Sequence, residues 1–281
     1  MRFTNPILTL AASAALVSLS SAADETYILA KKDDMPKPGT KLIHSRLMAM
    51  KKGTVKVKVG DQALQGTCEM IETETEHVEH VSAEKIKRLL TAAEKSEKMT
   101  MNGQERPHEA EPNPLLNVPV TLSKADGEWT ATIDGGKEPT AAQEKELSRK
   151  EKAMRKDEDV DMYGTVPRKV GDSWEVDASK ALPFSEDEKD TQGTLKLTFK
   201  AVEEFQGKKC ARLEGAMEMT GKTNQGQNIT MKGNVIVFRS IEDREDLKVT
   251  ITGTMGMSGE IPNGSMSMDG DLTMELTTKM E

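Results

Sequence analysis

Methionine is the residue type whose spacing in this chain most suggests chemistry. Five Met-x-Met pairs occur, at Met48/Met50, Met99/Met101, Met217/Met219, Met255/Met257 and Met266/Met268. On a β-strand, residues i and i+2 share one face, about 7 Å apart. A turn at 261–264 would bring the last two pairs onto one face, where four thioethers could bind Cu(I), which takes soft ligands. The pattern therefore raises the hypothesis of a soft-metal site.

The same methionines also fit an apolar interior. They continue an alternation that starts at Val249 and Ile251 and runs on to Leu272 and Leu276. The chain has only two Trp, two Tyr and five Phe residues, and Met is an adaptable filler of cores. No His or Cys lies in this hairpin to anchor a metal. We expect the methionines to line a core or a cavity, and the copper site is the less favoured hypothesis.

A histidine pair lies in the acidic stretch ETETEHVEH. On a helix, the i, i+3 spacing of His77 and His80 would form half of a zinc site. The flanking alternation indicates a strand, on which this spacing places the two rings on opposite faces. We expect a solvated acidic strand rather than a set of zinc ligands.

Other motifs of binding and catalysis are incomplete. DEDVDMYG (157–164) starts like a calcium loop, but Met162 replaces its glycine and Arg168 its final glutamate. Ser82 and Lys85 fit S-x-x-K without the companion motifs, and Ser82 has another use as a helix cap. No phosphate-binding loop, nucleophile elbow or zinc-protease motif is present in the sequence. We expect a non-catalytic protein without a cofactor.

The overall charge limits the partners. The formal net charge is −8 at pH 7, which disfavours nucleic acids and anionic membrane surfaces. The few aromatic residues leave little for stacking against bases. We expect no nucleic-acid partner, and consider an apolar small molecule, a lipid or a protein of the cell envelope.

The first 23 residues have the pattern of a signal peptide. Arg2 precedes an apolar run at 7–19, and the small residue Ala23 ends the segment. The run is too short to span a bilayer. We expect cleavage near Ala23, a mature chain starting at Asp24, and a soluble protein in the periplasm or outside the cell, with no stable membrane insertion.

The two cysteines of an exported chain favour a disulfide. A bridge between Cys68 and Cys210 would close a long loop and could stabilise the fold by about 4 kcal/mol. The alternative is a pair of unbonded thiols.

The C-terminal half alternates apolar and polar residues over five segments separated by turn signals. The segments are 194–204, 209–222, 228–238, 246–258 and 265–279. This pattern predicts an antiparallel meander with one apolar face that covers a core or a cavity.

The residue patterns of the N-terminal half predict strands and two helices. Residues 54–59 and 66–81 alternate as strands, and a hairpin turns at Asp126-Gly127. From Ser82 the apolar spacing changes to that of a helix of about four turns. A capping box at Thr140 opens a second, strongly charged helix.

Two stretches, TVPRKVGDSWEVD (165–177) and EFQGKKCARLEG (204–215), resemble a group of uncharacterised exported bacterial proteins. Those proteins carry a P-x-x-x-G-D-x-W turn before a strand, then a G-x-x-C/A hairpin and a β-meander. The matching residues here are Pro167, Gly171, Asp172, Trp174, Gly207 and Cys210. The resemblance implies export and a sheet like the open or closed barrels of periplasmic lipoprotein carriers and lipocalin-like binders. We expect Trp174 to pack at one end of the sheet as a structural corner.

Together these patterns predict one α+β domain over 24–281. Strands and helices occupy 24–165 and the meander 166–281, in a strongly curved antiparallel sheet of about ten strands, open or closed into a barrel, with two helices.

Our leading functional hypothesis is a binding protein whose concave face of Met, Leu and Val holds an apolar ligand such as a lipid or acyl chain. The alternative is a structural or interaction protein of the cell envelope with a filled core, and the third hypothesis is copper binding by the methionine pairs. The expected ligand-binding residues are Met217, Met219, Met231, Met255, Met257, Met266 and Met268.

Overall fold

A computed structural model describes residues 25–281 except 109–110, 156, 182–188 and 224–225. The predicted signal peptide and its cleavage site at Ala23 lie outside the described residues.

The described part of the chain forms one antiparallel sheet and three short helices. The strands are β1 (Lys41–Val59), β2 (Gln62–Ser82), β3 (Lys85–Met101), β4 (Gln104–His108), β5 (Pro119–Ala125), β6 (Glu128–Ile133), β7 (Ser173–Asp177), β8 (Lys189–Phe205), β9 (Lys208–Lys222), β10 (Asn228–Ser240), β11 (Asp246–Ile261) and β12 (Gly264–Met280). The helices are α1 (Ala141–Ala153), α2 (Glu158–Tyr163) and α3 (Ala178–Ala181).

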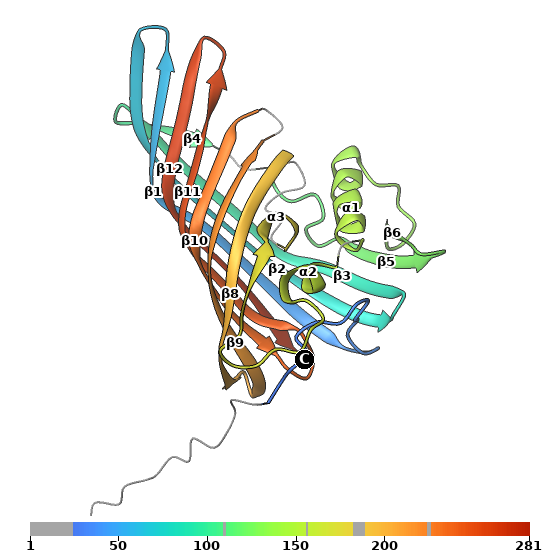
Figure 1. Ribbon diagram of the computed structural model, residues 1–281. Coiled ribbons are helices and arrows are strands. Elements are labelled where there is room, and N and C mark those ends of the chain that lie inside the picture. The colour runs from blue at the N-terminus through green and yellow to red at the C-terminus, as the bar shows by residue number, and fades with distance from the viewer. Residues whose placement is uncertain (1–24, 109–110, 156, 182–188, 224–225) are drawn as a thin grey trace, which may run out of the picture.

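The sheet joins the two halves of the chain through a long-range pairing. Its order is β6-β5-β3-β2-β1-β12-β11-β10-β9-β8-β7, and β4 pairs with β3. The first long strand, β1, pairs with the last, β12, from Leu42↔Met280 to Val59↔Gly264. Strands β6 and β7 form the two edges, and the sheet curves strongly without closing (Figure 1). The predicted curved antiparallel sheet is confirmed, as an open sheet.

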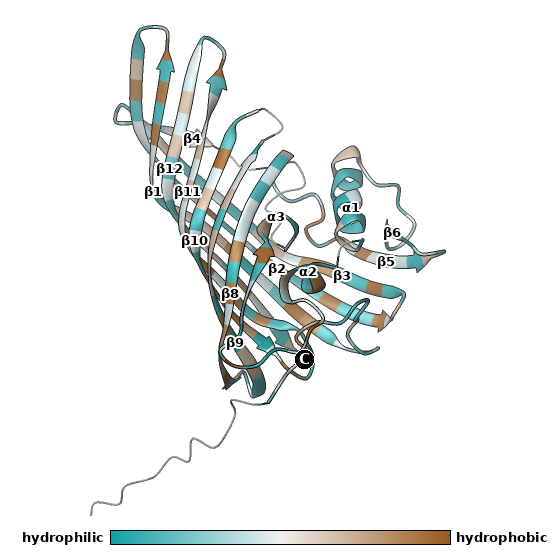
Figure 2. Ribbon diagram, in the orientation of Figure 1, coloured by the Kyte–Doolittle hydropathy of each residue, from teal (hydrophilic) through white to brown (hydrophobic). Residues whose placement is uncertain are grey.

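The predicted meander is also confirmed. The five expected segments match β8 to β12, and hydrophobic and hydrophilic residues alternate along these strands (Figure 2). Strands β11 and β12 meet at a tight turn in which Asn263 adopts a positive φ of 66°. The alternation of apolar and polar residues predicted these strands correctly because one face of each strand packs against a core.

The helix predicted from Ser82 is wrong, because this segment is the strand β3. It pairs with β2 from Ser82↔Lys85 to Gly66↔Met101. The buried residues Ile86 and Leu90 are four positions apart, a spacing that places side chains on one face of a helix and of a strand alike. The long pairing with β2 decides in favour of the strand.

The second predicted helix is confirmed as α1. Thr140 and Gln143 form the reciprocal capping box, with the Thr140 hydroxyl accepting from Gln143 N and the Gln143 side chain accepting from Thr140 N. Only Leu147 is buried among the residues of this charged helix. Helices α2 and α3, of six and four residues, were not predicted.

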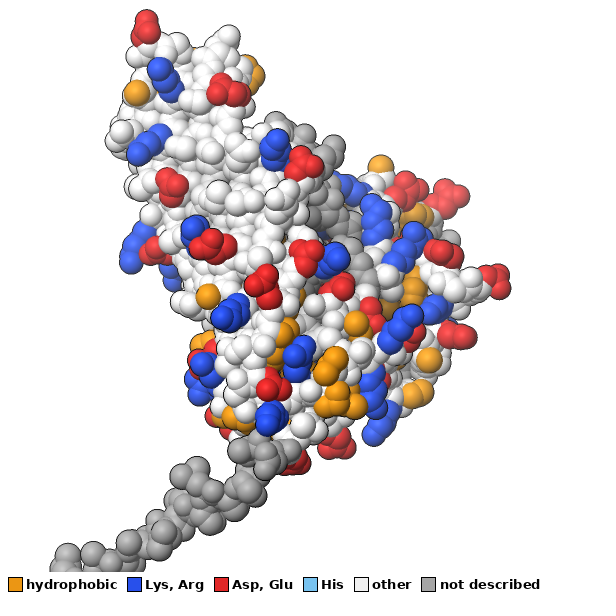
Figure 3. Space-filling view, viewed as in Figure 1, with side chains coloured by type: hydrophobic (Ala, Val, Ile, Leu, Met, Phe, Trp, Pro, Cys, Tyr) orange, Lys and Arg blue, Asp and Glu red, His pale blue; other side chains and the backbone are white. Residues whose placement is uncertain are grey.

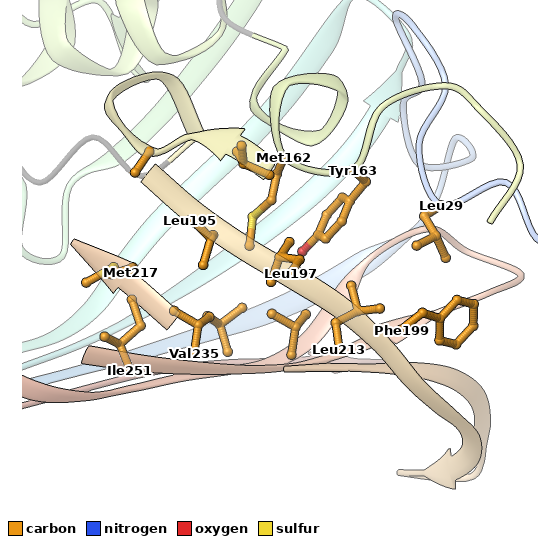
Figure 4. Close-up of a cluster of buried hydrophobic side chains, with 14 of the residues drawn as sticks. Leu29, Met162, Tyr163, Leu195, Leu197, Phe199, Leu213, Met217, Val235 and Ile251 are labelled. Carbon is orange, nitrogen blue, oxygen red and sulfur yellow. The ribbon is translucent and has the colours of Figure 1, made fainter. Parts of the chain in front are cut away.

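The inner face of the sheet, defined as the face on which α2 and α3 lie, carries the main core. Figure 4 shows Met162 and Tyr163 of α2 directed at Leu195 and Leu197 of β8. The Trp174 indole on the edge strand β7 donates a 2.9 Å hydrogen bond to the Met162 carbonyl. The expected structural role of Trp174 at one end of the sheet agrees with this contact.

Candidate functional site

Sulfur-containing side chains cross the inner face of the sheet in a continuous band. The sulfur band comprises Met50, Cys68, Met70, Met99, Met101, Met217, Met219, Met231, Met255, Met257, Met266 and Met268 on strands β1, β2, β3, β9, β10, β11 and β12. The strand register builds it, because directly paired residues on neighbouring strands point to the same side. Four complete Met-x-Met pairs, and Met50 of the fifth, thus contribute to a larger arrangement than the single hairpin patch predicted from the sequence.

One row of the band shows how it is assembled. Met231 of β10 is the direct partner of Met219 on β9 and of Met255 on β11. In the next row, Met257 pairs with Met268 across the β11–β12 hairpin. The prediction that the pairs 255/257 and 266/268 share one face is therefore correct.

The part of the band under α2 and α3 is a filled core. Met217, Met219 and Met231 are 1%, 5% and 4% exposed and pack with residues such as Met162 and Ala178 from these helices. These three methionines are core residues rather than the lining of a hollow, which corrects the expectation that all seven would meet a ligand.

The rest of the band lies where the sheet extends beyond the helices. The hairpins β1–β2 and β11–β12 project past α1, α2 and α3 (Figure 1). Their inner face carries a second apolar cluster, which we call the open-end cluster; it consists of Met50, Val55, Val57, Cys68, Met70, Met99, Met101, Met255 and Met268. Met257 and Met266 are half-buried beside it. Flexible apolar side chains therefore line a surface that none of the described helices overlies.

A groove of about 410 Å³ lies at the tip of these hairpins. Most of its lining residues stand at register positions of the outer face, such as Lys56, Lys58, Gln65, Ser258 and Ser265, whereas Val57, Leu64, Gly259 and Met266 stand at inner-face positions. The groove touches only the end of the sulfur band.

The predicted disulfide is wrong, since Cys68 and Cys210 are both free, buried thiols. Cys68 lies on β2 and Cys210 on β9, and four strands separate these two in the sheet. Neighbouring strands are about 4.8 Å apart, whereas a disulfide requires Cα atoms within about 7 Å. The alternative of two unbonded thiols holds.

Acidic residues of β2 point into the inner face, which the sequence did not reveal. Glu72, Glu74 and Glu76 alternate with threonines and are half-buried, whereas we expected a solvated acidic strand. Arg46 of β1 lies 3.8 Å from Glu72 and 3.7 Å from Glu74. A sequence signal for this polar part of the inner face was present in β1, where His44 and Arg46 lie two positions apart, as the glutamates of β2 do.

The most enclosed member of this polar cluster is Glu76. Its carboxylate forms ion pairs with Arg88 of β3 and with Lys150 of α1, the latter at 2.7 Å. Burial tends to raise the pKa of Glu76, but the two cations outweigh burial and the pKa is lowered. The cluster thus attaches α1 to the sheet.

Two histidines lie beside these charges. His44 Nδ1 is 3.1 Å from the Thr278 hydroxyl. Burial, helped by the charge of Arg88, lowers the pKa of His44 to about 4, and the same two causes lower the pKa of His80. His80 is buried and His77 exposed, so the predicted placement on opposite faces of a strand is confirmed.

The aspartates that resemble a calcium loop have structural partners. Asp157 caps α2 by accepting from Val160 N, and Asp159 binds Arg239 at 2.6 Å. Arg239 is 1% exposed, lies 4.2 Å above the Tyr163 ring and also pairs with Asp246 at 2.8 Å. This network joins β10, β11 and α2.

The described residues include neither a metal-binding cluster of His, Cys, Asp and Glu side chains nor a helix that could span a membrane. Within the described residues, no group of three or more His, Cys, Asp and Glu side chains is arranged to hold a metal ion. None of the described helices is long and apolar enough to cross a membrane. Basic and acidic side chains are interspersed on the face shown in Figure 3, which carries no continuous basic patch.

Comparisons with known proteins identify no family. No family model matches the chain, and no curated protein matches it. One solved structure, described as lipid–protein interactions in lipovitellin, is similar over 88% of this chain with a TM-score of 0.40 and 10% sequence identity. The chain spans 26% of that protein chain. Similarity at this level supports no statement about family or function.

Proposed function

We propose that this protein is a non-catalytic, exported binding protein that holds an apolar ligand, such as a lipid or an acyl chain, against the open end of its inner face. The observation that carries the proposal is the open-end cluster. Around the buried Met50, Val55 and Cys68, it places half-buried side chains on a curved surface that the described helices leave uncovered. The half-buried members are Val57, Met70, Met99, Met101, Met255 and Met268.

The chemistry of these side chains suits a ligand of variable shape. Methionine has three rotatable bonds and a polarisable sulfur, so it adapts to different apolar partners. Each methylene group that such a ligand buries contributes about 0.8 kcal/mol. Met257 and Met266 are only half-buried, so they retain apolar area that a ligand can cover.

Native mass spectrometry of the protein purified from a bacterial envelope without reductant tests this proposal. We expect a discrete adduct with the mass of a lipid or fatty acid, and the same adduct after incubation of the stripped protein with palmitate. A chain that stays bare after both treatments would contradict the proposal.

Export is part of the proposal and has its own test. The pattern of residues 1–23 supports cleavage near Ala23 and a soluble mature chain in the periplasm or outside the cell. N-terminal sequencing of the protein from the envelope fraction should give Asp24 as the first residue. Retention of Met1 in that fraction would contradict cleavage.

A structural or interaction protein of the cell envelope is the second candidate. The observation in its favour is that Met217, Met219 and Met231 belong to a filled core. This candidate needs no ligand, so it predicts that no apolar probe binds to the folded chain.

A further inference from the structure

The free thiol of Cys68 lies within the open-end cluster. Cys68 is the direct partner of Met99 on β3 and of Gly53 on β1, and it is 6% exposed. In the sequence, the absence of a Cys near the methionine pairs of the last hairpin disfavoured a soft-metal site. The sheet removes that objection, because it brings a cysteine from β2 next to methionines from other strands.

Thioethers surround this thiol on three strands. Met70 lies two residues from Cys68 on the same strand and face, and its direct partner on β1 is Met50. Met101 lies two residues from Met99 on β3. These four methionines and Cys68 belong to one contact cluster on the inner face of three neighbouring strands.

Glycines leave room for the sulfur atoms. The Cys68 sulfur lies 2.3 Å from the position that a Cβ on Gly53 would occupy, and the Met101 sulfur lies 2.6 Å from the corresponding position on Gly66. A larger residue at Gly53 would displace the Cys68 sulfur, and one at Gly66 would meet the Thr100 carbonyl oxygen at 1.9 Å as well as the Met101 sulfur. The two sulfurs therefore lie over gaps in the side-chain layer of the sheet.

We propose that Cys68, with thioethers from Met50, Met70, Met99 and Met101, binds one monovalent soft metal ion, Cu(I) or Ag(I). This inference goes beyond the proposed binding of an apolar ligand and does not depend on it. Thiolate and thioether ligands select such ions over Mg²⁺ and Ca²⁺, which prefer oxygen.

The charge balance favours a monovalent ion. On binding, the thiol releases its proton to solvent and a sulfur–metal bond forms, while the metal keeps its +1 state. One thiolate and one monovalent cation make a neutral unit, and this avoids the cost of burying a net charge. Because the bound ligand is a thiolate, metal binding should weaken as the pH falls.

Competition for Cu(I) against the chromophoric chelator bicinchoninate, under anaerobic conditions, tests the site. We expect the purified chain to withdraw one equivalent of Cu(I), and X-ray absorption to show only sulfur ligands. Replacement Cys68→Ala should weaken binding by at least about 100-fold, because loss of a direct ligand should cost no less than loss of supporting residues. The matched control Cys210→Ala removes the other buried thiol and should leave copper binding unchanged.

A second variant keeps the test decisive if Cys68→Ala fails to fold. The double replacement Met99→Leu/Met101→Leu conserves apolar volume, so it should keep the fold while losing affinity for Cu(I). Failure of the wild-type chain to compete for copper, equal competition by the Met99→Leu/Met101→Leu variant, or dependence on Cys210 would each overturn the proposal. Palmitate binding by the same samples reports separately on the apolar ligand.

Discussion

Lys150 of α1 donates a 2.7 Å hydrogen bond to the carboxylate of Glu76 on β2. The contact spans 74 positions in the sequence and attaches a helix with a single buried apolar residue to the sheet. The ion pairs of Glu76 thus add to the contacts of α1 with β6, where Leu147 packs near Ala131 and Glu151 accepts a hydrogen bond from Ala131 N.

Replacement of Glu76 by Gln tests this attachment. The change leaves Arg88 and Lys150 without their anionic partner in an enclosed site and should cost about 3 kcal/mol of the free energy of unfolding. Because the pKa of Glu76 lies below its ordinary 4.5, the contribution is present above pH 4.5 and is lost as the pH falls through the lowered pKa. Urea unfolding at pH 7 measures it.

The control for Glu76 is Glu69→Gln on the same strand. Glu69 is exposed, so this variant should lie within about 0.5 kcal/mol of wild type. Equal stability of the two variants would show that the ion pairs of Glu76 do not hold the helix.

His44 makes the fold sensitive to mild acid. Its pKa is about 4 in the folded protein against an ordinary 6.5, so between these values the unfolded chain binds a proton that the folded chain does not. The folded state is therefore favoured above pH 6.5, and a fall to pH 4 should remove about 3 kcal/mol. His44→Gln should flatten this part of the stability profile.

Urea midpoints measured every half pH unit give that profile, and the exposed His77 supplies the control. His77→Gln should follow the wild-type curve. A His44→Gln profile that is parallel to wild type from pH 6.5 to 4 would contradict the assignment.

Arg239 is the strongest electrostatic determinant of the core beside α2. It donates to the Leu29 carbonyl at 2.6 Å as well as to Asp159 and Asp246. Arg239→Met should destabilise the protein by about 3 to 5 kcal/mol, because it leaves the two carboxylates without their cation. Thermal unfolding should show the loss directly. Arg212→Met, which removes a half-exposed arginine from β9, should cost no more than about 1 kcal/mol.

Strands that bury one face and expose the other made much of this fold predictable from the sequence. Strands β8 to β12 alternate because their inner side chains, such as Leu213 and Val235, pack on a core. Strand β3 was not predictable in the same way, since Ile86 and Leu90 satisfy the period of a helix and of a strand. The pairing of β1 with β12 is a contact between the two ends of the chain, and no local pattern encodes it.

The candidate site was predictable only in part. The expected turn at 261–264 correctly predicted that Met257 and Met268 lie on one face of the sheet. Which methionines are covered depends on α2 and α3, which are too short to leave a helical period in the sequence. The meeting of Cys68 with Met99 depends on β3 being a strand, so the wrong helix prediction also hid this contact.

The central claim is that the open end of the inner face binds an apolar chain, and the most direct test is titration of the purified protein with cis-parinaric acid, a fluorescent fatty acid. The account predicts saturable binding that falls at least about tenfold in Met257→Lys, because the ligand would meet a buried charge. The control Ser258→Lys adds the same charge at the adjacent exposed position and should bind as wild type does. Absence of saturable binding, or equal binding by the two lysine variants, would contradict the claim.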